Sequence, residues 1–172
     1  MQSQPKTSHG AAAGLAGKYL TFQWGDEIYG LEILKVREII GLMDVTPVPR
    51  TPSHVRGVIN LRGKIIPVID LRSKFAMEKM ADTEQTCIIV VDLSTGEGVS
   101  QMGVLVDAVS EVLNIADEHI EPAPSFGGDV SADFIRGMAK TNNKVAILLN
   151  VEKVLSTTGV LQIAGSAAAT AA

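Results

Sequence analysis

The sequence is poor in the residues from which metal and cofactor sites are built. Its 172 residues include one cysteine, Cys87, and three histidines, His9, His54 and His119, that stand apart from one another. A single thiol cannot form an internal disulfide or a thiolate cluster, and no two histidines have metal-ligand spacing. We therefore expect no metal site and no cofactor, and we interpret Cys87, which lies in an apolar run, as a small buried side chain.

Three further absences exclude whole classes of protein. No apolar run approaches the roughly 18 residues that a membrane-spanning helix needs, and residues 1–17 lack the pattern of a secretory signal, so a cytoplasmic location is expected. Aromatic residues make up 4% of the chain and the net charge is −4, which is a poor match for a nucleic-acid-binding barrel. No Gly-x-Ser-x-Gly, P-loop or Gly-x-Gly-x-x-Gly motif is present, so no enzyme is expected.

The charge that is present is unevenly distributed. Residues 50–74 carry six basic side chains and one acidic one, a balance of 6 − 1 = +5. Residues 76–121 carry ten acidic side chains and one basic one, a balance of 1 − 10 = −9. This asymmetry favours electrostatically steered contacts with proteins, although solvated faces with no partner would give the same pattern.

The chain also repeats itself. Residues 30–40 align without a gap on residues 103–113, at an offset of 103 − 30 = 73, with a shared Gly-x5-Val-x-Glu pattern. Residues 55–75 align on residues 135–155, at an offset of 135 − 55 = 80, with Arg, Gly and Lys recurring. Two blocks in the same order at similar offsets predict a duplication, although β-rich segments can resemble one another without one.

Short apolar stretches separated by turn residues predict strands throughout the body of the chain. Gly25-Asp26 and Arg62-Gly63 are expected at hairpin tips, because glycine and asparagine tolerate positive φ. Residues 31–40 are interpreted as one helical turn followed by a strand. Asp70 and its counterpart Asn150 are expected to cap short helices. This pattern predicts an all-β protein of small barrels rather than a layered α/β fold.

The domain organisation follows from the two repeats. Residues 1–17 and 157–172 are rich in Ala, Gly and Ser and are interpreted as disordered tails. The body, residues 18–156, is divided into a first barrel at about 18–80 and a second at about 84–156. Each half alone would bury a marginal core, so the two are expected to share an interface.

Several of these segments resemble the CheW-like coupling proteins of bacterial chemotaxis. The most specific match is Arg56-Gly57-Val58-Ile59-Asn60-Leu61-Arg62-Gly63, followed by Ile66-Pro67-Val68-Ile69-Asp70-Leu71-Arg72. Residues 33–39, 104–113 and 120–124 extend the match over the body of the chain. The resemblance implies two SH3-like five-stranded β-barrels packed as a pseudo-repeat, with a hydrophobic groove between them and few short helices.

The resemblance also implies a function and a set of contact residues. CheW-like proteins are non-catalytic adaptors that join the cytoplasmic tips of methyl-accepting chemotaxis receptors to the regulatory domain of the histidine kinase CheA. The matching positions on the family's partner-binding surface are Val36, Glu38, Ile39, Gly57 and Arg62, with Val104 and Val109 expected on the second wall of the groove. We further hypothesise that Glu38 and Arg62 lie close together on one surface, although each could be an unrelated solvated charge.

Two other readings of the residues remain open at this point. A pair of nucleic-acid-binding barrels would show salt-dependent binding of an oligonucleotide. A small hydrolase would require a pocket that gathers His54 or His119 with carboxylates.

Overall fold

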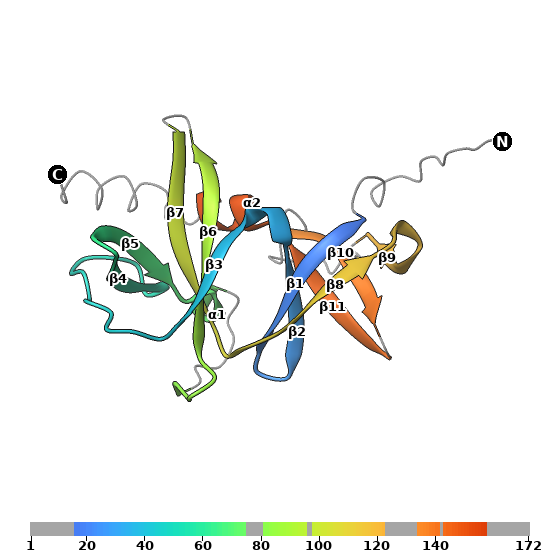
Figure 1. Ribbon diagram of the computed structural model, residues 1–172, viewed down its shortest axis with the longest axis horizontal. Helices are drawn as coiled ribbons and strands as arrows, with labels where there is room; N and C mark the ends of the chain where they lie inside the picture. Colours follow the sequence, from blue (N-terminus) through green and yellow to red (C-terminus); the bar gives the residue numbers. More distant parts are fainter. Residues whose placement is uncertain (1–15, 75–80, 96–97, 123–133, 142, 158–172) are drawn as a thin grey trace.

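The structure, a computed structural model, describes residues 16–74, 81–95, 98–122, 134–141 and 143–157 (Figure 1). The predicted tails lie outside the described residues except for positions 16–17 and 157. The described residues are mostly in strands and include two short α-helices, as the sequence predicts. They also include two 3-10 turns, of which the sequence predicts the one within residues 31–40.

One of the two sheets is built from both ends of the chain. Its six strands have the order β8-β1-β2-β11-β10-β9, and β2 pairs in parallel with β11 while its other neighbouring strands are antiparallel. We call this unit, with its helix α2, the six-stranded barrel. Its elements are β1 (Gly17–Trp24), β2 (Glu27–Glu32), β8 (Ala108–Ile115), the 3-10 turn η3 (Asp117–His119), β9 (Ile120–Glu121), β10 (Ile135–Thr141), β11 (Lys144–Leu149) and α2 (Val151–Thr157).

The other sheet comes from the middle of the chain. Its five strands have the order β3-β6-β7-β5-β4, and here β5 pairs in parallel with β7. We call this unit, with its helix α1, the five-stranded barrel; it lies on the left in Figure 1. Its elements are β3 (Val36–Gly41), β4 (Val55–Leu61), β5 (Lys64–Ile69), α1 (Leu71–Lys74), β6 (Cys87–Thr95) and β7 (Gly98–Val106). The 3-10 turn η2 (Ile33–Lys35) joins the two barrels.

The strand pairing confirms the predicted duplication. The pair Leu61↔Lys64 recurs 80 residues later as Thr141↔Lys144. Both parallel pairs involve a repeated glycine: Val68 lies opposite Gly103, and Leu148 lies opposite Gly30. A methyl group at either glycine would come within 2.9 Å or less of a side chain on a neighbouring strand, so close packing explains why the glycine recurs.

The spatial units do not follow the predicted division at residues 80–84. The five-stranded barrel runs from residue 36 to residue 106, and the six-stranded barrel takes residues 17–32 and 108–157. The repeated unit of the sequence therefore begins two strands before the barrel does: the first copy runs from β1 to β5, whereas the five-stranded barrel runs from β3 to β7. The reason is local: after β2 and again after β7 the chain passes directly into the other barrel, through three residues in the first case and one in the second.

Predicted turns and caps are confirmed. Arg62 and Gly63 have φ values of 53° and 85°, which are the positive values that a tight two-residue hairpin turn requires. The Asp70 carboxylate accepts a hydrogen bond from the backbone N–H of Arg72 at 3.1 Å, and the Asn150 side chain accepts one from Lys153 at 3.2 Å. These bonds satisfy donors that the first turn of a helix leaves free.

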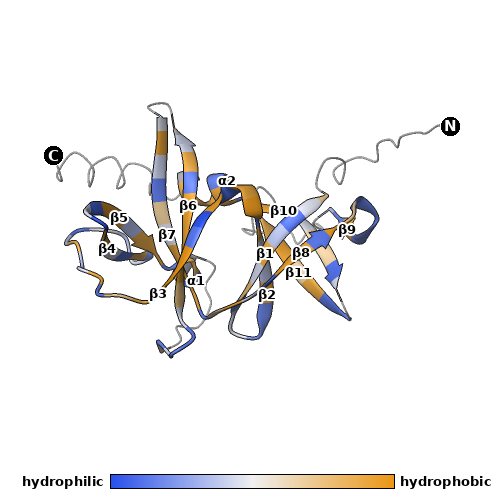
Figure 2. Cartoon of the chain, viewed as in Figure 1, coloured by the Kyte–Doolittle hydropathy of each residue, from blue (hydrophilic) through white to orange (hydrophobic). Residues whose placement is uncertain are grey.

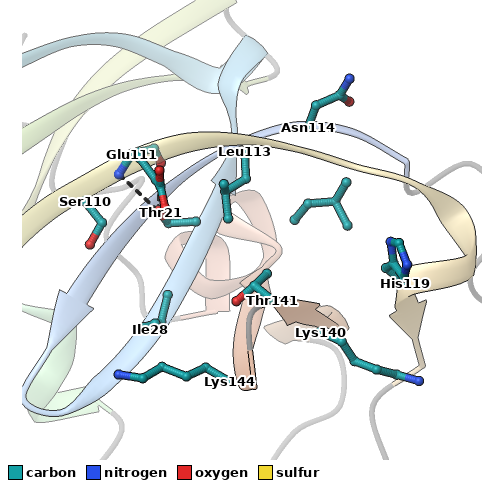
Figure 3. A pocket seen from close by; sticks show the side chains of 11 residues that line it. Thr21, Ile28, Ser110, Glu111, Leu113, Asn114, His119, Lys140, Thr141 and Lys144 are labelled. Carbon is teal, nitrogen blue, oxygen red and sulfur yellow. Dashed lines mark hydrogen bonds between the residues drawn. The ribbon is translucent and has the colours of Figure 1, made fainter.

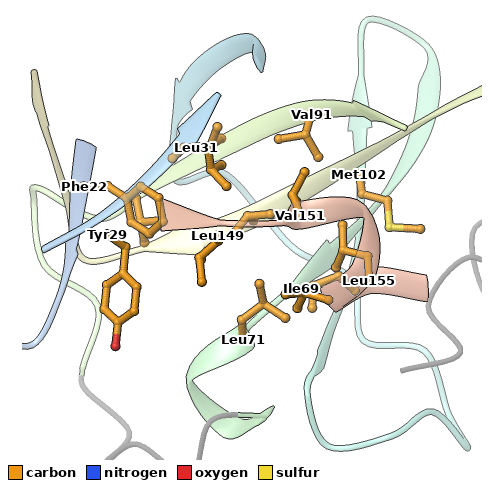
Figure 4. Close-up of a cluster of buried hydrophobic side chains, with 14 of the residues drawn as sticks. Phe22, Tyr29, Leu31, Ile69, Leu71, Val91, Met102, Leu149, Val151 and Leu155 are labelled. Atoms are coloured by element: carbon orange, nitrogen blue, oxygen red, sulfur yellow. The ribbon is translucent and has the colours of Figure 1, made fainter. Parts of the chain in front are cut away.

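The largest cluster of buried apolar side chains is shared by the two barrels. Phe22, Tyr29 and Leu31 of the six-stranded barrel lie in one cluster with Val91 and Met102 of the five-stranded barrel (Figure 4). Apolar residues follow the strands toward the middle of the molecule, whereas several hairpin tips are hydrophilic (Figure 2). The barrels therefore form one core at their junction, and each has a smaller core of its own.

Candidate interaction site

The Glu38–Arg62 pair lies at one end of the five-stranded barrel. Arg62 is at the tip of the β4–β5 hairpin, and its guanidinium donates a hydrogen bond to the carboxylate of Glu38 on β3. Asn60 stabilises the tip, because its side-chain oxygen accepts a hydrogen bond from the N–H of Gly63 at 2.8 Å. The hypothesis that Glu38 and Arg62 lie close together is confirmed.

This ion pair joins opposite edges of one sheet. β3 and β4 are the two outermost strands in the order of the five-stranded sheet, so a contact from β3 to the β4–β5 tip spans the rolled sheet. Arg62 keeps 69% of its side chain exposed and Glu38 keeps 30%. An exposed pair of this kind contributes about 0–1 kcal/mol to stability and is available to a partner.

Apolar side chains are exposed on β3 and just after it. Ile39 follows Glu38 on β3 and is 43% exposed, and Leu42 and Met43, just after the strand, are also exposed. Val36 begins β3 and is half-buried against the shared core. β3 and the residues after it therefore carry a charged pair and exposed apolar side chains, with Ile39 pointing to the opposite side of the strand from Glu38, and this mixture is typical of a protein-binding surface. We call this surface the Glu38–Arg62 face.

The other predicted contact residues lie elsewhere. Val104 is 1% exposed in the shared core, and Val109 is half-buried against it, so these two residues do not form the open second wall of a groove. Gly57 is buried, with φ at 147°, and a methyl group there would lie 2.2 Å from the carbonyl oxygen of Thr46. Alternating apolar residues indicated strands at these positions but could not show which strand face is covered by the other barrel.

A cavity opens at the mouth of the six-stranded barrel (Figure 3). Its volume is about 530 Å³, its apolar lining includes Ile28 and Leu113, and Lys140 and Lys144 also line it. His119 also lines it, but Figure 3 shows His119 at the opposite end from Ser110 and Glu111. Among the hydrogen bonds of the described residues, none joins the His119 side chain to a hydroxyl or a carboxylate.

The described residues contain no group of three or more His, Cys, Asp or Glu side chains that could hold a metal ion. Within the same part of the chain, no helix has the length and apolarity needed to span a membrane.

The comparison with known families decides the identity of this two-barrel arrangement. The CheW-like domain matches residues 18–159, which is most of the chain. The chain belongs to the CheW-like domain family. Members of this family are similar to it over their own length as well. The chemotaxis protein CheW of Klebsiella aerogenes is 41% identical over 139 residues, which cover 81% of each chain.

Two other CheW-like relatives support the assignment. Protein FrzA of Myxococcus xanthus is 32% identical over 155 residues, covering 89% of this chain and 94% of FrzA. The crystal structure of the scaffolding protein TtCheW from Thermoanaerobacter tengcongensis matches with a TM-score of 0.73 and 37% identity. That match covers 84% of this chain and 95% of TtCheW. The prediction of a CheW-like protein is confirmed, and the family is one of chemotaxis scaffolds.

Proposed function

We propose that this chain is a non-catalytic cytoplasmic adaptor that couples methyl-accepting chemotaxis receptors to the histidine kinase CheA. Its CheW-like relatives are chemotaxis proteins, and one of them is described as a scaffolding protein. A scaffold acts by holding partners rather than by transforming a substrate. The partners themselves are the finer part of the proposal and follow from the family resemblance.

The observation that carries the proposal is the Glu38–Arg62 face. It presents one exposed positive charge and one half-exposed negative charge, and Ile39, the next residue on β3, exposes its side chain on the opposite side of the strand. Charges at the edge of an interface steer association and select orientation, while an apolar side chain beside them supplies buried area. We propose Val36, Glu38, Ile39 and Arg62 as the partner-contacting residues, with Gly57 acting through the backbone that supports them.

The test is reconstitution of the signalling complex from purified receptor cytoplasmic fragments, kinase and this chain. Kinase activity is expected to respond to the receptors only when the chain is present. Arg62→Glu is expected to weaken capture of kinase or receptor about tenfold, since removal of an interface charge changes binding by about 1–2 kcal/mol. Its melting temperature should remain close to that of the parent chain, because the pair is exposed.

A matched control is available on the other barrel. Lys140 and Glu121 form an exposed ion pair at 2.6 Å, with 59% and 61% of the two side chains exposed. Lys140→Glu reverses a charge in a similar setting and should leave capture by the Glu38–Arg62 face unchanged. Equal losses of capture in Arg62→Glu and Lys140→Glu would contradict the assignment of this face. Receptor control of the kinase without the chain would contradict the function itself.

A further inference from the structure

The shorter of the two connections between the barrels is the single residue Asp107. β7 of the five-stranded barrel ends at Val106, and β8 of the six-stranded barrel begins at Ala108. The N–H of Asp107 donates a hydrogen bond to the carbonyl oxygen of Gln23 at 3.0 Å. One carboxylate oxygen of Asp107 accepts a hydrogen bond from the N–H of Gly25 at 2.6 Å. Both the backbone and the side chain of Asp107 are thus bound to the β1–β2 hairpin of the six-stranded barrel.

The second carboxylate oxygen of Asp107 binds the five-stranded barrel. It accepts a hydrogen bond from the Arg72 guanidinium in α1. The same guanidinium donates two further hydrogen bonds to the two carboxylate oxygens of Asp70, each at 2.9 Å. The N–H of Asp70 in turn donates to the carbonyl oxygen of His54 at 2.7 Å. A continuous chain of hydrogen bonds therefore runs from one barrel to the other through Asp107.

This chain of hydrogen bonds is largely removed from water. The Arg72 side chain is 3% exposed, that of Asp70 is 4% exposed and that of Asp107 is 20% exposed. The hydrogen bond to Asp70 is the main reason that the pKa of Arg72 is raised, and burial opposes it. Buried charge pairs add little net stability compared with apolar packing, because desolvation offsets most of their attraction. Their geometry, however, is directional, whereas the apolar core around them is not.

We infer that Asp107 is a positioning residue, which fixes the orientation of one barrel relative to the other. The shared apolar core holds the barrels together, and the hydrogen bonds that Asp107 accepts from Gly25 and Arg72 select one orientation among those that the core would permit. One consequence rests on the proposed function. A partner bound to the Glu38–Arg62 face is held at a fixed angle to any second partner bound by the six-stranded barrel.

The other connection between the barrels lacks this network. There the ion pair is Lys35–Glu152 at 2.8 Å, and the two side chains are 31% and 39% exposed. Leu34, which aligns with Asp107 in the repeat, is 92% exposed. A pair that water and salt can reach constrains its elements weakly. Orientation is therefore set on the Asp107 side, and Glu152 serves as the matched control.

The test is a distance measurement between spin labels, one on each barrel. Lys64→Cys on the five-stranded barrel and Val145→Cys on the six-stranded barrel place labels on exposed hairpin positions, in a background in which Cys87 is replaced by serine. In Asp107→Asn, which keeps the shape but removes the charge, the distribution of distances should broaden or shift. Amide hydrogen exchange within the strands of each barrel should stay as in the parent chain. Glu152→Gln should leave the distribution unchanged.

A second variant distinguishes a change in barrel orientation from a loss of folding. In Asp70→Asn/Arg72→Met/Asp107→Leu the charges are removed together, so no buried charge is left unpaired, and melting should occur at or above the parent temperature. Its inter-barrel distances should nevertheless spread. A folded triple variant with a distribution as narrow as that of the parent would overturn the inference. Because the distances are measured without partners, that outcome is independent of the reconstitution that tests the proposed function.

Discussion

The ends of the two barrels show how one duplicated unit has produced two different surfaces. On the five-stranded barrel, Ile40 and Leu61 pack partly buried against the core of that barrel, and the Glu38–Arg62 pair spans the end. On the six-stranded barrel, the positions equivalent to Ile40 and Leu61 are Leu113 and Thr141, and both line the cavity. The first end is bridged by an ion pair, and the second opens into a cavity.

A small number of substitutions accounts for the difference. Thr141 replaces Leu61, so a branched apolar side chain is exchanged for a smaller one with a hydroxyl group. Glu111 aligns with Glu38, but the residue that aligns with Arg62 is Asn142, whose short amide carries no charge. The strand frame is the same in both units, so binding properties in this fold depend on the side chains at the barrel ends.

The largest expected effect comes from a substitution that the backbone of β4 cannot accommodate. Gly57→Asp should lower the free energy of unfolding by about 3–5 kcal/mol, because φ is positive and the new Cβ would meet the Thr46 carbonyl oxygen. Denaturant unfolding measures this change, and partner capture should fall only in proportion to the folded fraction. Gly63→Asn is the control, since Gly63 also has positive φ but has open space around it. Native stability in Gly57→Asp together with lost capture would instead assign Gly57 to direct contact.

The hairpin at Arg62 and the helix cap at Asp70 show which parts of the fold could be predicted from the sequence. The hairpin at Arg62-Gly63 and the cap at Asp70 depend on local backbone preferences, which the sequence states directly, and both are confirmed. The proximity of Glu38 to Arg62 was predictable as well, because the family pattern places both on one surface.

Other features depend on contacts between segments far apart in the chain. Val104 was predicted to line a groove, but its strand is covered on both faces once the other barrel packs on it. The role proposed for Asp107 could not be predicted for the same reason, because its partners Gly25 and Arg72 are brought to it only by the crossing of the chain between the barrels. A sequence repeat therefore predicts which strands recur, but not which of their side chains the other barrel covers.

Exchanging the two barrel ends should give a smaller effect of opposite sign in the two units. Leu61→Thr removes apolar contacts from a packed end and should cost about 1–2 kcal/mol of unfolding free energy. Thr141→Leu adds an apolar side chain to a cavity lined by Ile28 and Leu113 and should leave stability unchanged or raise it by up to about 1 kcal/mol. Urea unfolding of both variants gives the comparison. Similar destabilisation in both would mean that the six-stranded end is already as closely packed as the other.

The smallest effect concerns Glu152, the repeat equivalent of Arg72. The hydrogen bond from Lys35 lowers the pKa of Glu152 below its usual value, although partial burial opposes the shift. A carboxylate whose folded-state pKa is lowered adds stability above its unfolded-state pKa, and that contribution is lost as the pH falls through the folded-state value. Because the pair is more than one-third exposed at Glu152, screening limits the contribution to about 0–1 kcal/mol.

The measurement is the unfolding free energy of the parent chain and of Glu152→Gln between pH 7 and pH 3, at low and at high salt. At low salt the parent should be slightly more stable at neutral pH, and the difference should vanish as the pH falls below the usual range of a glutamate. High salt should remove most of the difference at every pH. A difference that persists in high salt would mean that the Lys35 side holds the barrels as firmly as the Asp107 side, and the contrast between the two connections would then fail.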